Sequence, residues 1–331
     1  MAHAAVQPAH AATHFQLGAI GDPLPGGVAL PMFPQLQELF GVNFTPECVS
    51  ALARCASRLR VITSSVVEAG WAPGVRHASL PNVTHTFFFN CSAGCALPRV
   101  VNLQRLLPAA QELGFKLTVG DVFNCPALDG LTGLRALTVH SGNWEGAHVR
   151  NWDVLARMSG LTRLVCGLDS CDPVQLSQLV RLTALEELLI DLWPGDDGFE
   201  EDPLPVISFP MGALFDAAAR MPRLHTLIAS SSYAESGLKL DFGTLARFMC
   251  APTALRRLEL RTCTWPPLAL VPALAAHPRL RRLVFSCGAI EAKTADELIA
   301  QAYATRDDCA VTGVKGDVEL AWSELCSWFW D

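Results

Sequence analysis

One spacing of leucines recurs in LTGLRALTV (131–139), MSGLTRLVC (158–166), LTALEELLI (182–190), MPRLHTLIA (221–229), PTALRRLEL (252–260) and HPRLRRLVF (277–285). An apolar residue is followed by two free positions, Leu, two free positions, Leu, one free position and a second apolar residue. Self-similarity at intervals of about 20 to 40 residues is the signature of a repeat protein. The clear copies lie within residues 131–290, and weaker copies at 33–44, 56–67, 80–93 and 113–124 extend the pattern over residues 31–125.

The end of each copy has the spacing of a short β-strand. The second Leu and the following apolar residue are two positions apart, so both side chains lie on one face of a strand. The earlier Leu, three residues upstream, lets the chain turn into that strand with an apolar side chain inward.

Segments between the copies have helical spacing. In DPVQLSQLVRL, Asp172 is expected to cap a helix that starts at Pro173. Similar helices are expected in AHVRNWDVLARM, DFGTLARFM and TADELIAQAYA. The side chains expected to point inward are Val149, Trp152, Leu155, Val174, Leu176, Leu179, Val180, Phe242, Leu245, Phe248, Met249, Leu298, Ile299 and Tyr303.

One strand and one helix cannot bury a core alone, so the copies are expected to stack. We predict an α/β solenoid over residues 31–303, with parallel strands on the concave face of a horseshoe and helices outside. The competing fold, a doubly wound α/β domain, usually has long apolar strands and a Gly-rich turn after the first strand. The sequence has neither feature.

The strands LRALTV, LTRLVC, LEELLI, LRRLEL and LRRLVF resemble those of the leucine-rich-repeat superfamily. Cysteines in RTCTW and FFFNC are similar to those of its cysteine-containing and ribonuclease-inhibitor-like classes. The resemblance covers residues 56–290 and implies a binding scaffold, such as an inhibitor, a ubiquitin-ligase substrate receptor, or a cytoskeletal or ciliary component. The uneven repeat lengths depart from the family pattern. The ligase alternative lacks a visible F-box.

The two ends of the chain differ from the repeats. Residues 1–30 are rich in Ala, His, Pro and Gly and are expected to be disordered. Residues 304–331 end in AWSELCSWFWD and are expected to form a cap over the apolar end of the solenoid. The alternative for this Trp-rich end is an aromatic tail that binds a partner.

Composition limits the classes of function. The net charge is −7, which argues against nucleic acid, and no apolar run is long enough for a signal peptide or a membrane span. The twelve cysteines are scattered among apolar residues, which favours reduced, buried thiols over disulfides or zinc sites. We therefore expect a cytoplasmic protein, with the cytoskeleton or the ciliary axoneme as narrower alternatives, and no cofactor.

The free position between the second Leu and the next apolar residue should face the concave surface. This column consists of Phe87, Thr118, Thr138, Val165, Leu189, Ile228, Glu259 and Val284, flanked by His85, Phe89, His140, Asp191, Arg257, Arg261 and Arg282. An apolar centre with polar and basic flanks is typical of a protein-binding surface. The alternative is that loops or termini of the same chain cover the column.

We expect a non-enzymatic scaffold for protein–protein interaction that binds its partner through Phe87, Phe89, His140, Val165, Leu189, Ile228, Arg257, Arg261 and Arg282. A basic cluster of Arg256, Arg257, Arg261, Arg279, Arg281 and Arg282 could bind an acidic segment or phosphate, or be a solvated face. The acidic segment 194–205 lacks the spacing of a calcium loop. His140 and Cys166 are one conceivable catalytic pair, but Cys166 is expected to point inward. No nucleotide-binding or hydrolase motif occurs.

Overall fold

A computed structural model describes residues 14–16, 34–67, 78–91, 102–117, 122–141, 148–168, 173–192, 211–231, 242–251, 253–261, 277–287 and 310–315. The chain divides into two compact units, residues 1–160 and 161–331, and each is described by itself. Each is an α/β unit with an open parallel sheet, an arrangement that is compatible with a leucine-rich-repeat-like solenoid.

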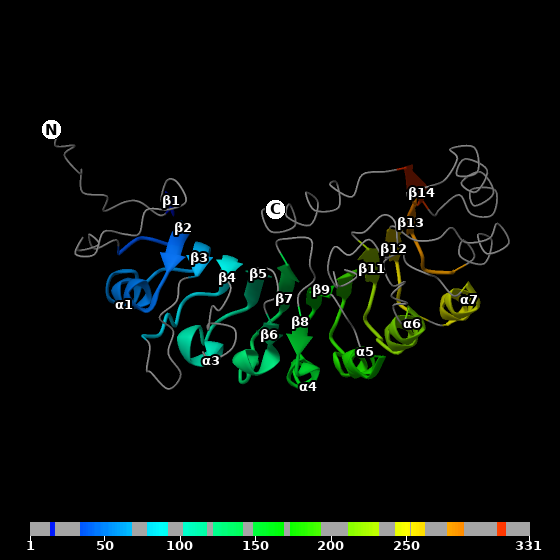
Figure 1. Cartoon of the computed structure of the whole chain (residues 1–331), viewed down its shortest axis with the longest axis horizontal. Helices are drawn as coiled ribbons and strands as arrows, with labels where there is room; N and C mark the ends of the chain where they lie inside the picture. The colour runs from blue at the N-terminus through cyan, green and yellow to red at the C-terminus, as the bar shows by residue number, and fades with distance from the viewer. Residues whose placement is uncertain are drawn as a thin grey trace, which may run out of the picture. The chain divides into compact units, whose positions relative to one another are not determined.

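In unit 1 the strands pair in chain order, each parallel to the next (Figure 1). They are β1 (His14–Gln16), β2 (Glu38–Phe44), β3 (Val61–Val67), β4 (His85–Cys91), β5 (Glu112–Leu117) and β7 (Ala136–Ser141). The helices are α1 (Pro46–Cys55), α3 (Leu103–Leu106), the 3-10 turn η1 (Cys125–Leu128) and α4 (Trp152–Leu155). A second, two-stranded sheet joins β6 (Val122–Asn124) to β8 (His148–Arg150).

Unit 2 repeats this architecture, again with parallel neighbours in chain order. Its strands are β9 (Arg163–Leu168), β10 (Glu187–Leu192), β11 (Thr226–Ser231), β12 (Arg257–Arg261), β13 (Arg282–Cys287) and β14 (Ala310–Lys315). Its helical segments are α5 (Pro173–Gln178), η2 (Leu179–Arg181), α6 (Met211–Ala219) and α7 (Phe242–Cys250). Helix α5 contacts α6, and α6 contacts α7, along one side of the sheet (Figure 1).

The inward register of the leucine pattern is confirmed. Leu188 lies opposite Leu164 and Leu227 in the neighbouring strands, and all three are at most 1% exposed. The apolar residue two positions later is also buried, as Ile190 and Cys166 illustrate. The turn before the strand closes with a hydrogen bond from the first Leu back to the apolar residue that opens the copy, such as Leu185 N–H to the Leu182 carbonyl at 3.0 Å.

At the entrance of eight of the described strands, a backbone carbonyl accepts two hydrogen bonds from the next repeat. The Glu186 carbonyl accepts from the backbone N–H groups of His225 and Thr226, at 2.9 and 3.1 Å. The equivalent carbonyls in unit 2 belong to Thr162, His225 and Arg256, and those in unit 1 to Gln37, Arg60, Thr84 and Gln111. This entrance ladder fixes the register between consecutive repeats because a shift by one residue would leave its donors unpaired.

His277 departs from the apolar pattern. It is a polar residue at the first position of the last clear copy, and it is only 2% exposed. Its Nδ1 accepts hydrogen bonds from the backbone N–H groups of Leu280 (3.1 Å) and Arg279 (3.3 Å). The neutral ring must therefore carry its proton on Nε2, which lies 3.0 Å from Thr253 Oγ1. The ring thus ties the turn before β13 to the preceding repeat.

The expected helices are confirmed at α5 with η2, where Leu176 and Leu179 are buried, and at α7, where Leu245, Phe248 and Met249 are buried. The helix expected in AHVRNWDVLARM is confirmed only as the short α4, which buries Trp152 and Leu155; Val149 is buried too, but it lies in the strand β8 instead of a helix. The inward placement of Val174 is wrong, since this side chain is 61% exposed. It lies at the second position of α5, and the burial begins with the next turn of the helix. Val180 is only partly buried. The side chain of Phe242, the expected cap Asp172, the segment 294–304 and residues 316–331 lie outside the described residues.

Two strands occur where the sequence predicts no repeat. β1 lies within the segment expected to be disordered and pairs with β2, so that expectation is wrong for residues 14–16. β14 lies within the expected C-terminal cap and pairs with β13 over its whole length, as another strand of the sheet. Gly41, with φ of 71°, sits at a register shift between β2 and β3, where a bulge needs the left-handed conformation.

Candidate functional site

The expected column on the sheet face opposite the leucines is confirmed as a column in unit 2. Val165, Leu189, Ile228, Glu259 and Val284 lie opposite one another in consecutive strands. Its exposure is not confirmed. Val165, Leu189 and Ile228 form a buried apolar cluster, with exposed fractions of 3 to 6%, and Val284 is equally buried. The prediction that these residues form an accessible docking surface is wrong, because both faces of the sheet are buried there.

In unit 1 the column includes Phe40, Thr63, Phe87, Gly114 and Thr138. Thr118 lies outside the described residues; the position opposite Thr138 is taken by Gly114, because β5 places Leu113 opposite Leu137. Thr138 is buried, whereas Phe87 is partly exposed.

The Phe87 ring lies against Gly114. A Cβ atom on Gly114 would come within 2.0 Å of Phe87 Cδ2, so only glycine leaves room for the ring. The centroid of the His140 ring lies 6.4 Å from that of Phe87, and His140 is partly exposed. Phe87 and His140 therefore form one small surface group, as predicted, while the side chains of Phe89 and Arg261 lie outside the described residues.

Ion pairs connect the flanking positions across neighbouring strands. His85 Nε2 lies 3.6 Å from Glu112 Oε1, and Arg163 Nε lies 3.5 Å from Glu187 Oε2. Asp191, predicted as an exposed flank, is instead buried and accepts a 2.5 Å hydrogen bond from Ser230 Oγ. These contacts link strands within each unit.

Four arginines lie next to one another in the backbone at the start of β12 and β13. Arg257 lies opposite Arg282, and the backbone N–H groups of Arg281 and Arg282 both bind the Arg256 carbonyl. We define the arginine block as Arg256, Arg257, Arg281 and Arg282. Parallel neighbours are about 4.8 Å apart, so these four like charges repel one another unless an anion lies among them. Arg256, Arg281 and Arg282 are exposed, and the Arg257 side chain is 22% exposed.

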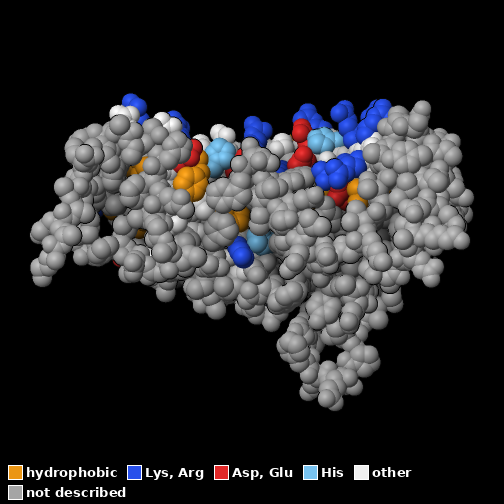
Figure 2. All heavy atoms as spheres, turned by 90° about the horizontal axis from the view of Figure 1, so that it is seen from above, with side chains coloured by type: hydrophobic (Ala, Val, Ile, Leu, Met, Phe, Trp, Pro, Cys, Tyr) orange, Lys and Arg blue, Asp and Glu red, His pale blue; other side chains and the backbone are white. Residues whose placement is uncertain are grey.

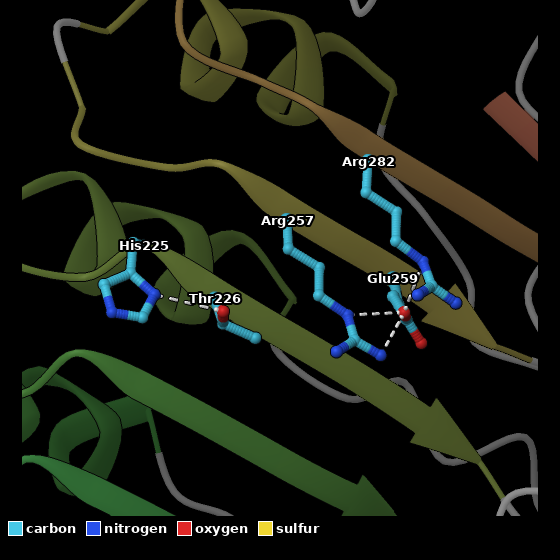
Figure 3. Close-up of polar contacts among 5 residues, drawn as sticks. All are labelled: His225, Thr226, Arg257, Glu259 and Arg282. Atoms are coloured by element: carbon cyan, nitrogen blue, oxygen red, sulfur yellow. Dashed lines mark hydrogen bonds and ion pairs between the residues drawn. The ribbon is translucent and has the colours of Figure 1, made fainter. Parts of the chain in front are cut away.

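The anion among the arginines is Glu259, whose side chain is fully buried (Figure 3). Its Oε1 accepts hydrogen bonds from Arg257 Nε at 2.7 Å and from Arg257 Nη2 at 2.6 Å. Arg282 Nε, from the next strand, lies 3.4 Å from the same oxygen. One carboxylate therefore holds two guanidinium groups, and the block with Glu259 keeps a formal charge of +3.

Positive charge is concentrated in this part of the chain. Residues 220–287 contain nine Arg and one Lys against three acidic residues, a net charge of +7. Because the whole chain carries −7, the remainder carries −14. Figure 2 shows Lys and Arg side chains along its upper edge, with the largest group to the right of the centre, beside a few acidic side chains and a histidine. The arginine block is thus a basic surface on an otherwise acidic protein.

The buried cysteines offer poor nucleophiles. Burial is the main cause that raises the pKa of Cys125 from 9.0 to about 12, with the Asp153 charge as a smaller contribution, so its thiol stays protonated at neutral pH. Cys166 is 1% exposed, as expected from its inward position. Cys48 is also buried and free, whereas Cys250 is exposed, which the expectation of buried thiols missed.

Within the described ranges, no three His, Cys, Asp or Glu side chains converge as a metal site would require. No helix in the same ranges has the length and apolar composition to cross a membrane.

No family model and no curated sequence matches the chain. The case for function therefore rests on the chemistry of the arginine block and its surroundings.

The sequence names all four arginines of the block but not the role of Glu259. The signal was present in the pattern, because Glu259 is the one charged residue in the column expected to be apolar. The pattern does not show that this carboxylate would be buried between two guanidinium groups.

Proposed function

We propose that the chain is a non-enzymatic leucine-rich-repeat solenoid, with strands on its concave face and helices outside, that holds a partner protein. The partner contributes an acidic segment, which lies on the arginine block. Support for the repeat architecture comes from the strands of each unit, which pair in parallel and in chain order with the leucines inward. A reducing compartment such as the cytoplasm suits its buried free thiols.

The arginine block is the observation that carries this proposal. Arg256, Arg281 and Arg282 are exposed, and the stretch that contains them, residues 220–287, has a net charge of +7 in a chain whose net charge is −7. Arginine pairs with carboxylates through planar, charge-assisted hydrogen bonds, and it is enriched at protein interfaces. The buried apolar column cannot serve as a partner's first contact, so the charged edge of the same face takes that role.

The test combines proximity labelling in cells with direct binding. Candidate partners are purified, and their affinity for the full chain is measured by isothermal titration calorimetry at two salt concentrations. We expect a direct complex that weakens as salt increases and weakens at least tenfold when Arg256→Glu and Arg281→Glu are combined, as charge reversal at a complementary surface would do.

The matched control reverses two charges on the helical side of the same unit, Arg220→Glu and Arg247→Glu. Both residues are exposed and lack an ion pair among the described residues, where their guanidinium groups bind Asp216 and Thr244 of their own helical segments. If the control weakens the complex as much as the block variant does, or if no candidate binds directly, the proposal is wrong.

A further inference from the structure

Glu259 differs from the residues on either side of it in the column. Its neighbours in the adjacent strands are the apolar Ile228 and Val284, yet Glu259 is fully buried and carries a carboxylate. Taking a carboxylate out of water is costly, and replacing a buried ion pair by apolar residues is often neutral or stabilising. Stability alone therefore does not account for a glutamate at this position.

What Glu259 does in the structure is orient two arginines. Free arginine side chains sample many rotamers, and neighbouring guanidinium groups repel one another. Here Arg257 is held through two of its nitrogens and Arg282 through its Nε, all by Oε1 of Glu259 (Figure 3). Both guanidinium groups are thereby fixed before any ligand arrives, so binding loses less entropy.

Arg282 keeps donors that the described residues do not use. Its side chain is half exposed, and neither of its terminal nitrogens has a partner among the residues that the structure describes. These two nitrogens form the planar fork that matches the two oxygens of a carboxylate. The +3 charge of the block with Glu259 adds attraction for an anion.

We propose that Glu259 is a positioning residue that presents the guanidinium groups of Arg257 and Arg282 to side-chain carboxylates of an Asp- and Glu-rich segment. This inference rests on the proposed function and adds the chemistry of recognition. A short acidic peptide fits better than nucleic acid or an anionic membrane. Those extended polyanions would also meet the rest of the chain, which carries −14.

The test measures the affinity of the full chain for a fluorescein-labelled hexaglutamate peptide by fluorescence anisotropy. Hexaglutamine is the uncharged control peptide, and a single-stranded oligothymidine of similar length is the nucleic-acid comparison. The chain variants are Glu259→Val, Glu259→Gln, Arg282→Lys and, as a control away from the block, Arg220→Lys.

Two explanations of binding, by charge alone or by the position of the guanidinium groups, predict opposite changes in hexaglutamate affinity for Glu259→Val. If attraction depends on charge alone, loss of a carboxylate beside the arginines tightens hexaglutamate binding. If Glu259 positions the arginines, the affinity falls about tenfold, since charge-assisted hydrogen bonds lose their geometry. We expect the fall, a smaller fall for Glu259→Gln, which keeps the acceptor oxygen, and a similar tenfold loss for Arg282→Lys, which keeps the charge. Arg220→Lys should change nothing.

Thermal unfolding separates the positioning role from a structural one. Glu259→Val should unfold at the same temperature as the wild type or higher. The inference is overturned if Glu259→Val binds more tightly, if Arg282→Lys binds as the wild type does, or if oligothymidine binds more tightly than hexaglutamate. It is also overturned if neutralising Asp196, Asp197, Glu200, Glu201 and Asp202 raises the peptide affinity tenfold, because the chain's own acidic segment would then be the occupant.

Failure here is distinguishable from failure of the proposed function. One outcome is that the chain fails to bind hexaglutamate while charge reversal of Arg256 and Arg281 still weakens its complex with the partner protein. In that case the partner binds through the arginine block, and only the positioning role of Glu259 is wrong. If the charge reversal leaves the affinity for the partner unchanged, the proposed function itself is wrong.

Discussion

Leu189→Ala tests whether the column opposite the leucines belongs to the core. Leu189 is 5% exposed and lies between Val165 and Ile228, which are buried with it. The substitution removes three carbon groups, and at about 0.8 kcal/mol for each buried group the transfer contribution is about 2.4 kcal/mol. The cavity left behind adds to this loss, so we expect destabilisation of about 2 to 5 kcal/mol, as for Leu→Ala in other cores.

The free energy of unfolding is measured by urea denaturation, followed by far-UV circular dichroism and by tryptophan fluorescence. The two probes must report the same transition before a free energy is derived. Leu188→Ala, on the opposite face of the same strand and 1% exposed, should cost a similar amount. Val174→Ala, at a side chain that is 61% exposed, should stay within about 0.5 kcal/mol of the wild type.

The outcome that would refute the burial of this column is specific. If Leu189→Ala behaves like Val174→Ala while Leu188→Ala is strongly destabilising, the second face of the sheet is open to solvent. The column would then return to being a candidate for partner contacts.

Four further predictions concern single sites. Gly114→Ala should destabilise unit 1 by about 1 to 3 kcal/mol through overpacking against Phe87, and adding Phe87→Ala should remove most of that cost in a double-mutant cycle. His277→Ala should cost about 1 to 3 kcal/mol in urea denaturation because two buried backbone N–H groups lose their acceptor; a neutral result would mean that water replaces the ring. Burial raises the pKa of Cys125 in the folded chain, so the unfolded chain loses this proton first, and the free energy of unfolding should fall as the pH rises from 9.0 toward about 12. Below pH 9.0 this contribution is intact. Cys125→Ala should make the free energy of unfolding less dependent on pH in this range, and an unchanged dependence would exclude Cys125 as its source. In native protein, maleimide should modify the exposed Cys250 and spare Cys125, as mass spectrometry of tryptic peptides would show.

The parallel strands, their register and the inward leucines could be predicted because they depend on local spacing. Leu137, Leu188 and Leu258 all lie at the buried positions that the pattern assigns to them. At β5 the pattern is too weak to choose between two frames, and the structure chooses the frame in which Gly114 lies under Phe87. A glycine in the column is invisible to a pattern defined by apolar residues.

Burial of the column and the pairing of Glu259 could not be predicted because they are tertiary properties. Alternation places Leu189 and Ile228 on the face opposite the leucines, but it does not say whether that face is covered. Similarly, Glu259 lies two residues from Arg257 in the sequence, on the same face of β12, whereas its contact with Arg282 requires the neighbouring strand. The sequence could identify the residues of the basic cluster but not their geometry.

Because of the entrance ladder, the register and spacing of the strands do not depend on the number of residues in a repeat. Asp191 and Ser230 are 39 residues apart in the chain, yet they lie opposite one another in strands that pair without a shift. Thr253 and His277, in the following repeats, are joined across only 24 residues. Because the spacing of the strands is set by backbone hydrogen bonds at their entrance, extra residues can enter after a strand without moving the next one. Natural variation or engineering can therefore lengthen the chain after β10, or exchange that stretch entirely, and still leave the arginine block on β12 and β13 with its present spacing.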